Sequence, residues 1–129
     1  MFIVGKPVDI VWTKLAATAD AGSSVIKVQD SVTWTNGDKI IIASTGPANS
    51  VVQNELHTVV SVAADGVTIT INGTLQFDHL GVMEIAGSHS LEYRAEVGML
   101  TRNIVIQGDR DPQWDVKIEA CPAGFDVGE

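Results

Sequence analysis

Three aspartates near the end of the sequence have a spacing that could support chemistry. Asp109, Asp111 and Asp115 lie within seven residues, and hard cations such as calcium bind carboxylate oxygens at short spacings. An EF-hand loop counted from Asp109 would need glycine and glutamate where this sequence has Trp114 and Ala120. The pattern therefore favours a solvated acidic turn, and no metal ligand is predicted here.

Two glutamates around an arginine form the second candidate. Glu92 and Glu96 could act as the acid and base carboxyl groups of a glycoside hydrolase. A strand would place Glu92, Arg94 and Glu96 on one face, however, which favours a structural ion-pair ladder. The arginine should also lower the pKa of both carboxyl groups, whereas a general acid needs a raised pKa. We therefore predict no catalytic pair at these positions.

Serine and histidine residues offer two further kinds of site. The run 87–90 (GSHS) is similar to a hydrolase nucleophile, but it lacks the second glycine of the strained elbow, and adjacent strand residues point to opposite faces. His57, His79 and His89 are too scattered to predict a metal site, and each is better interpreted as a polar surface or half-buried residue. The sequence thus predicts no catalytic residue, no metal site and no cofactor-binding residue.

Three tryptophans, one sequon and one cysteine complete the candidates. Trp12, Trp34 and Trp114 could stack on sugars, but they are scattered and are better interpreted as core anchors, with Trp12 anchoring the first strand. Residues 72–74 (NGT) fit the acceptor pattern for N-linked sugars at the end of a predicted strand, so Asn72 is a glycosylation candidate. The single cysteine, Cys121, has no partner within the chain for a disulfide.

The composition favours strands as the elements that position these residues. Ile and Val together number 29 and Thr 10, against 6 Leu, and β-branched side chains fit a pleated sheet. No segment has apolar residues at helical spacing over about ten positions, so we expect no helix longer than about two turns. Two turn pairs occur between the expected strands. The pair 36–37 (NG) comes before the apolar run 39–43, and the pair 65–66 (DG) lies between two apolar runs. The second pair predicts a hairpin between 55–63 and 67–71, with both turn residues tolerating positive φ.

Alternating apolar residues define the remaining strands and the core. We expect strands at 23–29, 39–43, 82–85, 90–94 and 103–107, and a loop at 44–54. The expected barrel interior consists of Trp34, Ile40, Ile42, Val60, Ile69 and Ile71.

The charge of the chain excludes two classes of partner. Sixteen acidic against 8 basic residues give a formal net charge of −8 and a pI near 4.6, which would repel a phosphate backbone or an anionic lipid surface. We therefore predict no nucleic acid partner and no direct membrane contact. No apolar run approaches the roughly 20 residues of a membrane span, and residues 1–11 have two charges and a proline where a signal peptide would be apolar.

Four stretches of the sequence carry a resemblance to a known family. They are residues 12–15 (WTKL) with the strand at 22–28, then 34–45 (WTNGDKIIIAST), 94–108 (RAEVGMLTRNIVIQG) and 117–129 (KIEACPAGFDVGE). In this order they resemble the segment that follows the eight-glycine domain in fibrocystin-L-like proteins. That family is shared with the cell migration-inducing hyaluronan-depolymerising protein, and the tail is most similar to the fibrocystin-L branch.

The resemblance implies an all-β fold, with a small β-barrel or sandwich inserted between coils of a right-handed parallel β-helix. Residues 1–21 would form an incoming β-helix strand, 22–77 the barrel or sandwich, 78–108 the return to β-helix coils, and 109–129 a truncated, irregular acidic tail. In the return segment Ile104 and Ile106 would stack inward, with Gly98 and Gly108 at the bends. Cys121 would form a disulfide with a cysteine outside this chain.

The resemblance also implies a role. The chain would be a non-catalytic structural or ligand-presenting module of a large extracellular, receptor-like cell-surface protein, as the fibrocystins are thought to be in immune and sensory hair cells. Expected partners are the remaining domains of the parent protein, with glycans or other cell-surface proteins as further candidates. The alternative is a fragment of a hyaluronan or polysaccharide depolymerase or binding protein with a β-helix. The net charge of −8 disfavours a long anionic substrate.

Overall fold

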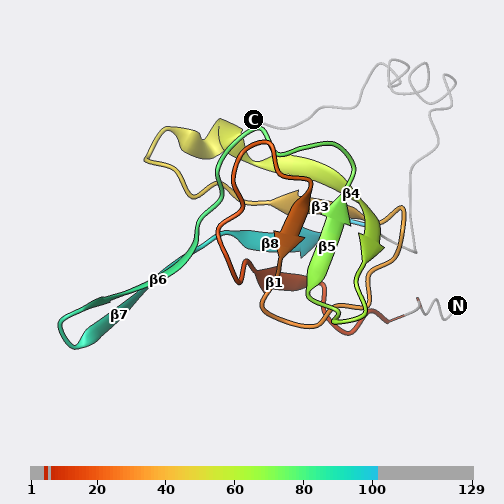
Figure 1. Ribbon diagram of the computed structural model, residues 1–129, viewed down its shortest axis with the longest axis horizontal. Helices are drawn as coiled ribbons and strands as arrows, with labels where there is room; N and C mark the ends of the chain where they lie inside the picture. Colours follow the sequence, from red (N-terminus) through yellow and green to blue (C-terminus); the bar gives the residue numbers. More distant parts are fainter. Residues whose placement is uncertain (1–4, 6, 102–129) are drawn as a thin grey trace, which may run out of the picture.

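The computed structural model describes residues 5 and 7–101 and has an all-β fold, as predicted (Figure 1). The strands are β1 (Trp12–Lys14), β2 (Val25–Lys27), β3 (Lys39–Ile42), β4 (Glu55–Val62), β5 (Thr68–Ile71), β6 (Gly81–Ala86), β7 (His89–Arg94) and β8 (Glu96–Met99). One 3-10 helix, η1 (Ser50–Gln53), lies within the predicted loop 44–54. Over the described residues, no helix has the length and apolar character needed to cross a membrane.

Six of the strands form an antiparallel sheet that closes on itself. Their order is β1-β8-β3-β4-β5-β2. The two outer strands then meet, because Leu15 bridges Val28 and the N–H of Ala16 donates to the carbonyl of Lys27 over 2.8 Å. The sheet is therefore a small barrel in which β1 and β2 cover each other's edges.

The barrel encloses an aliphatic core. Its buried members include Leu15, Ile26, Val28, Val32, Trp34, Ile40, Ile42, Val59, Ile69, Ile71, Leu75 and Val97. The predicted interior is thus confirmed for every residue except one. Trp34 is held in place by its indole N–H, which donates to the carbonyl of Ile10 over 2.7 Å, so this polar atom is satisfied inside an apolar surrounding.

The prediction for Val60 is wrong. Its side chain is 43% exposed, whereas Val59 is fully buried. A β-bulge in β4 is the reason: Val59 pairs with Ile71, but the pairing then skips Val60 and resumes at Ser61. The extra residue reverses which side chains point inward, so that Val62 packs against the core after the bulge.

Trp12 does not anchor the first strand as predicted. It is 51% exposed, while Thr13 and Leu15 on the opposite face of the chain are buried. Thr13 can occupy an inward position because its hydroxyl donates to the carboxylate of Asp30 over 2.7 Å, which satisfies the buried polar group.

Glycine occupies the left-handed positions of both predicted turns. Gly37 has φ +95° and Gly66 has φ +72°, a region that other residues rarely adopt. The predicted hairpin is confirmed, because β4 pairs with β5 across this turn, but of its two turn residues only Gly66 has a positive φ. The carboxylate of Asp65 shapes this turn instead, accepting hydrogen bonds from the N–H groups of Val67 and Thr68, each over 3.0 Å.

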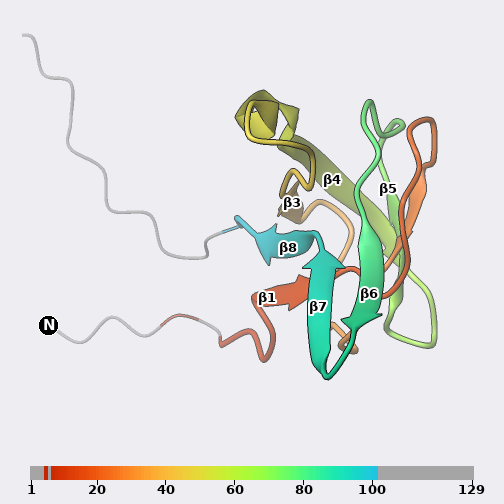
Figure 2. The same cartoon turned by 90° about the vertical axis from the view of Figure 1, so that its left-hand side faces the viewer.

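Strands β6 and β7 form a separate hairpin that projects from the barrel (Figures 1 and 2). Residues 81–86 pair with 89–94 in continuous register, which confirms the two predicted strands. The connecting turn is Gly87-Ser88, and Gly87 has φ +64° at the first turn position, as a type II′ turn requires. At the base, a Cβ on Gly81 would collide with the backbone of Ala17, so only glycine allows this close crossing.

The chain returns to the barrel through β8. Gly98 was expected at a bend, but it lies within β8 and pairs with Trp12 on one side and Ile41 on the other. Strands from both flanks of the 22–77 segment therefore share one sheet with β3. The division of the chain into barrel and β-helix coils stays a prediction, and Ile104, Ile106 and Gly108 lie outside the described residues.

Candidate functional site

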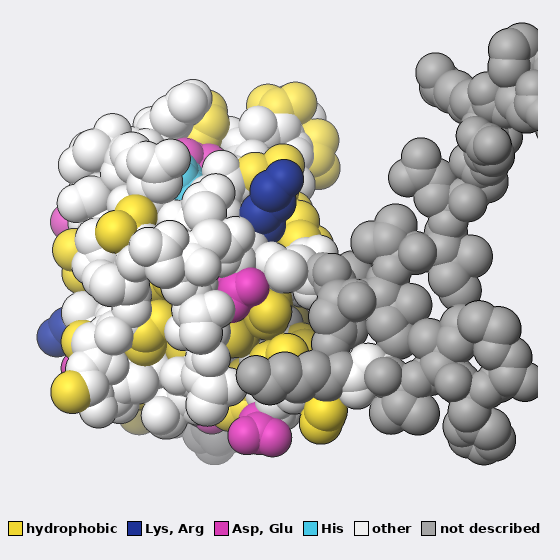
Figure 3. Space-filling view, turned by 90° about the vertical axis from the view of Figure 1, so that its right-hand side faces the viewer, with side chains coloured by type: hydrophobic (Ala, Val, Ile, Leu, Met, Phe, Trp, Pro, Cys, Tyr) yellow, Lys and Arg dark blue, Asp and Glu magenta, His cyan; other side chains and the backbone are white. Residues whose placement is uncertain are grey.

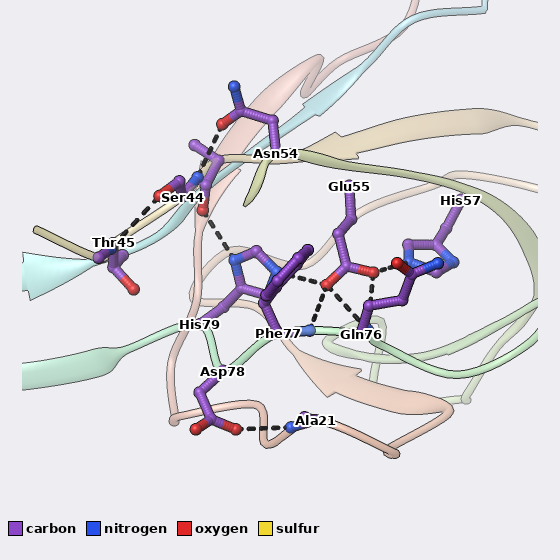
Figure 4. Close-up of polar contacts among 12 residues, drawn as sticks. Ala21, Ser44, Thr45, Asn54, Glu55, His57, Gln76, Phe77, Asp78 and His79 are labelled. Carbon is purple, nitrogen blue, oxygen red and sulfur yellow. Dashed lines mark hydrogen bonds and ion pairs between the residues drawn. The ribbon is translucent and has the colours of Figure 1, made fainter. Parts of the chain in front are cut away.

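A buried glutamate at the start of β4 is the centre of a polar cluster (Figure 4). The side chain of Glu55 is 7% exposed. Its Oε1 accepts a hydrogen bond from the N–H of Phe77 over 2.9 Å, and the N–H of Gln76 lies 3.0 and 2.9 Å from Oε1 and Oε2. These donors belong to the connection between β5 and β6. The carboxylate therefore fixes that connection on the barrel.

Two histidines flank the same carboxylate, and we call Glu55, His57 and His79 the Glu55 cluster. The Nε2 atom of His79 lies 3.0 Å from Oε1, and that of His57 lies 3.1 Å from Oε2. On the other side of each ring, Nδ1 of His79 donates to the carbonyl of Ala43 over 2.9 Å, and Nδ1 of His57 to the carbonyl of Asn72 over 3.2 Å. His79 is fully buried.

Each ring lies between two oxygen atoms, one from a backbone carbonyl and one from the Glu55 carboxylate. Carbonyl and carboxylate oxygens only accept, so all four ring hydrogen bonds form together when each ring carries both protons. Burial raises the pKa of Glu55, but the hydrogen bonds from Gln76, His79, Phe77 and His57 outweigh burial and lower this pKa from 4.5 to about 2. The cluster is thus an ionised carboxylate that lies between two histidine rings.

This geometry suits a structural role. Both oxygens of Glu55 are occupied by donors, which leaves no free site for a reacting group. Within residues 5 and 7–101, no group of three His, Cys, Asp or Glu side chains is arranged to hold a metal ion. Nearby, Asp78 accepts a hydrogen bond from the N–H of Ala21 over 2.7 Å (Figure 4). Segments far apart in sequence are thereby joined at one end of the barrel.

Sequence reasoning missed the Glu55 cluster because its members are separated along the chain. Glu55 and His57 alternate with Val59 on the inward face of β4, and an inward Glu-x-His pair was the available signal. His79 lies in a connection without periodicity, so nothing local placed it beside β4. His89, by contrast, is exposed in the hairpin, as the interpretation of a polar surface residue expected.

An open groove of about 750 Å³ lies where β1 and β8 meet the segment before β3. Its lining includes Asp9, Trp12, Thr33, Asp38 and Gly98. Lys14 holds its ammonium 5.7 Å from the centre of the Trp12 ring, a cation–π distance that helps to orient the indole. The groove thus combines one exposed aromatic ring with acidic and hydroxyl side chains.

The predicted ladder of Glu92, Arg94 and Glu96 is present only in part. The ion pair of Glu92 with Arg94 is 3.8 Å long, and Lys14 lies 2.8 Å from the Glu92 carboxylate. Glu96 belongs to the next strand, β8, because the chain turns into the barrel at the buried Ala95. The hydrogen bond from Lys14 and the charges of Lys14 and Arg94 outweigh desolvation and lower the pKa of Glu92, the direction that the sequence predicted.

The other candidate residues divide between the surface and the undescribed part of the chain. Ser88 and His89 lie in and beside the exposed hairpin turn. Asn72 is exposed directly after β5, so its side chain is accessible, and its glycosylation stays a prediction. Residues outside the described ranges include the acidic candidates at 109–115, Trp114 and Cys121.

Comparisons with known proteins match the chain to short parts of much longer relatives. No model of a known protein family matches it. Over 126 residues it is 50% identical to fibrocystin-L of Homo sapiens and 48% identical to fibrocystin-L of Mus musculus; each alignment covers 97% of this chain and 3% of the relative. A G8 domain-containing protein of Dictyostelium discoideum is 36% identical over 115 residues, covering 86% of this chain and 7% of that protein.

A solved structure shares the fold over part of the chain. It is the Gp54 tailspike of Acinetobacter baumannii bacteriophage AP22, in complex with A. baumannii capsular saccharide. The alignment has a TM-score of 0.50 and 21% sequence identity, and it covers 67% of this chain and 14% of the tailspike. The two fibrocystin-L sequences show what kind of protein the chain belongs to, because their similarity extends over 97% of it. The chain is a fibrocystin-L-like segment.

Proposed function

We propose that the chain is a non-catalytic structural module of a large extracellular, receptor-like protein, and that its β6–β7 hairpin docks against a neighbouring part of the same polypeptide. The chain spans about 3% of the fibrocystin-L sequences, so each of these relatives has extensive further chain that could supply the docking surface. The proposal includes β-helix coils on either side of the barrel, which the resemblance implies and the tailspike likeness in fold supports.

The observation that carries the proposal is the apolar surface of the hairpin. Ile85 is 83% exposed and Met83 53%, while Leu91 and Tyr93 are about half exposed. Directly paired residues share one face of a hairpin, so Val82, Leu91 and Tyr93 lie on one face, whereas Met83 and Ile85 lie on the other. A two-stranded hairpin is at best marginally stable alone in water. A neighbouring surface that covers the exposed apolar residues on both faces would stabilise the hairpin.

The charged residues of the hairpin agree with an interface. Glu92 and Arg94 are engaged at the base with Lys14 and Gln29 of the barrel, so they set the direction in which the hairpin leaves. Apolar residues occupy the projecting part, with Glu84 beside them. An apolar centre with a polar rim is typical of surfaces that become buried between domains.

The proposal also states that the chain has no catalytic activity of its own. The Glu55 cluster uses its donors and acceptors internally, and the lowered pKa of Glu92 opposes a role as general acid at neutral pH. We expect no shortening of high-molecular-mass hyaluronan by this chain, as followed by gel filtration with light scattering. A reproducible loss of size that Glu92→Gln abolishes would support the depolymerase alternative instead.

Photo-crosslinking tests the docking. A photoreactive phenylalanine analogue replaces Ile85 in the full parent polypeptide, and in a matched variant it replaces Ala64, which is exposed in the β4–β5 turn. We expect intramolecular crosslinks from position 85 to residues outside the barrel, and markedly fewer from position 64. Equal crosslinking at the two positions would contradict the docking proposal.

A further inference from the structure

We propose that the groove beside Trp12 binds a neutral oligosaccharide, with the indole as a platform for one sugar ring. This inference goes beyond the structural role and does not depend on the hairpin. Docking of the hairpin could fail while the groove still binds sugar, and the reverse also holds.

The side chain of Trp12 is unusually exposed for a tryptophan in this barrel. It is 51% exposed, in contrast to Trp34 at 4%. The indole N–H of Trp34 donates to a backbone carbonyl, whereas none of the described hydrogen bonds uses the indole N–H of Trp12. An exposed indole offers a flat apolar face for the C–H groups of a pyranose ring and an N–H donor for one of its hydroxyl groups.

Space for a ligand exists beside the ring. Trp12 pairs across β1 and β8 with Gly98, which has no side chain, and both line the groove. A Cβ at position 98 would meet Ile41 at an ordinary 3.5 Å, so packing alone does not require glycine there. The bare backbone at Gly98 leaves the indole accessible from the groove.

Polar groups converge on the same space. The carboxylate of Asp9 is exposed and has no hydrogen bond among the described contacts. Asp38 is held in position because its Oδ2 accepts from the N–H and the hydroxyl of Thr35, over 2.8 and 3.1 Å. Thr33 adds a further hydroxyl to the lining. A few fixed polar groups beside an apolar surface are typical of small-molecule sites, and carboxylates accept hydrogen bonds from sugar hydroxyls.

The charge of the site selects a neutral ligand. The described lining contains Asp9 and Asp38 but neither lysine nor arginine. The ammonium of Lys14 lies 5.7 Å from the Trp12 ring, but its charge is paired with Glu92 over 2.8 Å, and the whole chain has a net charge of −8. The basic side chains visible in Figure 3 are isolated from one another and form no continuous strip. An anionic polymer would therefore be repelled from this groove, whereas an uncharged glycan would not.

Titration calorimetry of the 129-residue chain tests the proposal with cellohexaose, maltohexaose and mannohexaose as neutral probes and a hyaluronan hexasaccharide as the anionic probe. We expect at least one neutral probe to bind and the hyaluronan probe not to bind. Trp12→Leu keeps an apolar side chain beside Gly98 but removes the flat ring, and it should weaken binding by about tenfold or more. Tyr93→Leu removes another half-exposed aromatic ring, outside the groove, and should leave binding unchanged.

Three outcomes would overturn the proposal. They are failure of every neutral probe to bind, binding of the hyaluronan probe alone, and equal losses for Trp12→Leu and Tyr93→Leu. Circular dichroism and urea unfolding of both variants establish that they remain folded. If Trp12→Leu does not fold, protection of the Trp12 indole against oxidation in the native chain by the bound sugar provides the second readout.

Discussion

Glu55 carries a charge inside the barrel, and the neighbours that compensate for this charge belong to the β5–β6 connection and to two histidines. Glu55→Gln should destabilise the fold by about 3–5 kcal/mol, because it leaves the buried donors and rings without their anionic partner. Urea unfolding at pH 7 measures the change. Glu96→Gln, at an exposed acidic position, should change stability by less than about 0.5 kcal/mol. Similar effects of the two substitutions would contradict a structural role for the cluster.

The pH dependence of stability follows from the same carboxyl group. Its pKa in the folded chain is about 2, below the ordinary value of 4.5, so the folded state favours the ionised form. The stabilisation is complete above the unfolded pKa and is lost as the pH falls from about 4.5 towards about 2. It amounts to at most about 3.5 kcal/mol, since one pKa unit corresponds to about 1.4 kcal/mol.

Comparison with Glu55→Gln isolates this contribution. The native chain should lose more stability than the variant between pH 5 and about 2.5, as followed by urea midpoints at each pH. Parallel profiles would show that other carboxyl groups account for the acid sensitivity.

The burial of a side chain could be predicted where it depends on the alternation of residues along one strand. It could not be predicted where it depends on segments that are distant in the sequence. Ile40 and Ile42 are buried on one face of β3, as the alternation indicates. His79 is buried because its ring bridges Ala43 and Glu55, and those partners lie 36 and 24 residues away. Spacing in the sequence alone carries no signal for such a contact.

At the scale of the elements, the bulge in β4 makes a direct prediction. Ile69→Ala should destabilise the fold by about 2–5 kcal/mol, because Ile69 is fully buried in β5 and its loss leaves a cavity. Val60→Ala, at the exposed bulge position, should cost less than about 0.5 kcal/mol. Chemical denaturation of both variants compares them. An equal cost at position 60 would mean that Val60 points inward in solution.

The strands themselves were largely predictable, whereas their inward faces were not always so. Turn glycines and β-branched runs correctly placed β2 to β7 within a few residues. The inward face reverses at the bulge after Val59 and again before β1, where Thr13 rather than Trp12 is buried. Both reversals depend on partners across the sheet, such as Asp30 for Thr13, and a period-two pattern cannot reveal them.

For the whole molecule, the sequon at Asn72 gives a prediction about the cellular context. Asn72 is exposed in the turn after β5, so the chain should carry an N-linked glycan when it is made through a secretory pathway. Glycosidase treatment should then increase its gel mobility. Thr74→Ala removes the sequon but leaves the backbone carbonyl of Asn72 for His57, so this variant should remain folded and unglycosylated. An untreated native chain that migrates with Thr74→Ala would contradict the prediction.

The closure of the barrel lay beyond what the sequence could predict. The family resemblance and the composition both indicate an all-β chain. The resemblance, however, places residues 1–21 and 78–108, which contain β1 and β8, in β-helix coils that flank the barrel. The structure pairs them, with Trp12 opposite Gly98, 86 residues further along the chain. Pairings over such separations depend on loop closure and packing of the complete fold.

The pairing of β1 with β8 also determines how the module responds to mechanical force. The chain enters and leaves the barrel at adjacent points, since the N–H of Met99 donates to the carbonyl of Val11 over 2.8 Å. Tension applied through the two flanks therefore pulls β1 and β8 apart sideways and loads their hydrogen bonds one after another, in an unzipping geometry. Bonds broken singly resist less than bonds sheared together. Under tension applied at these two points, the barrel should therefore unfold at a lower force than a module whose terminal strands are sheared along their length.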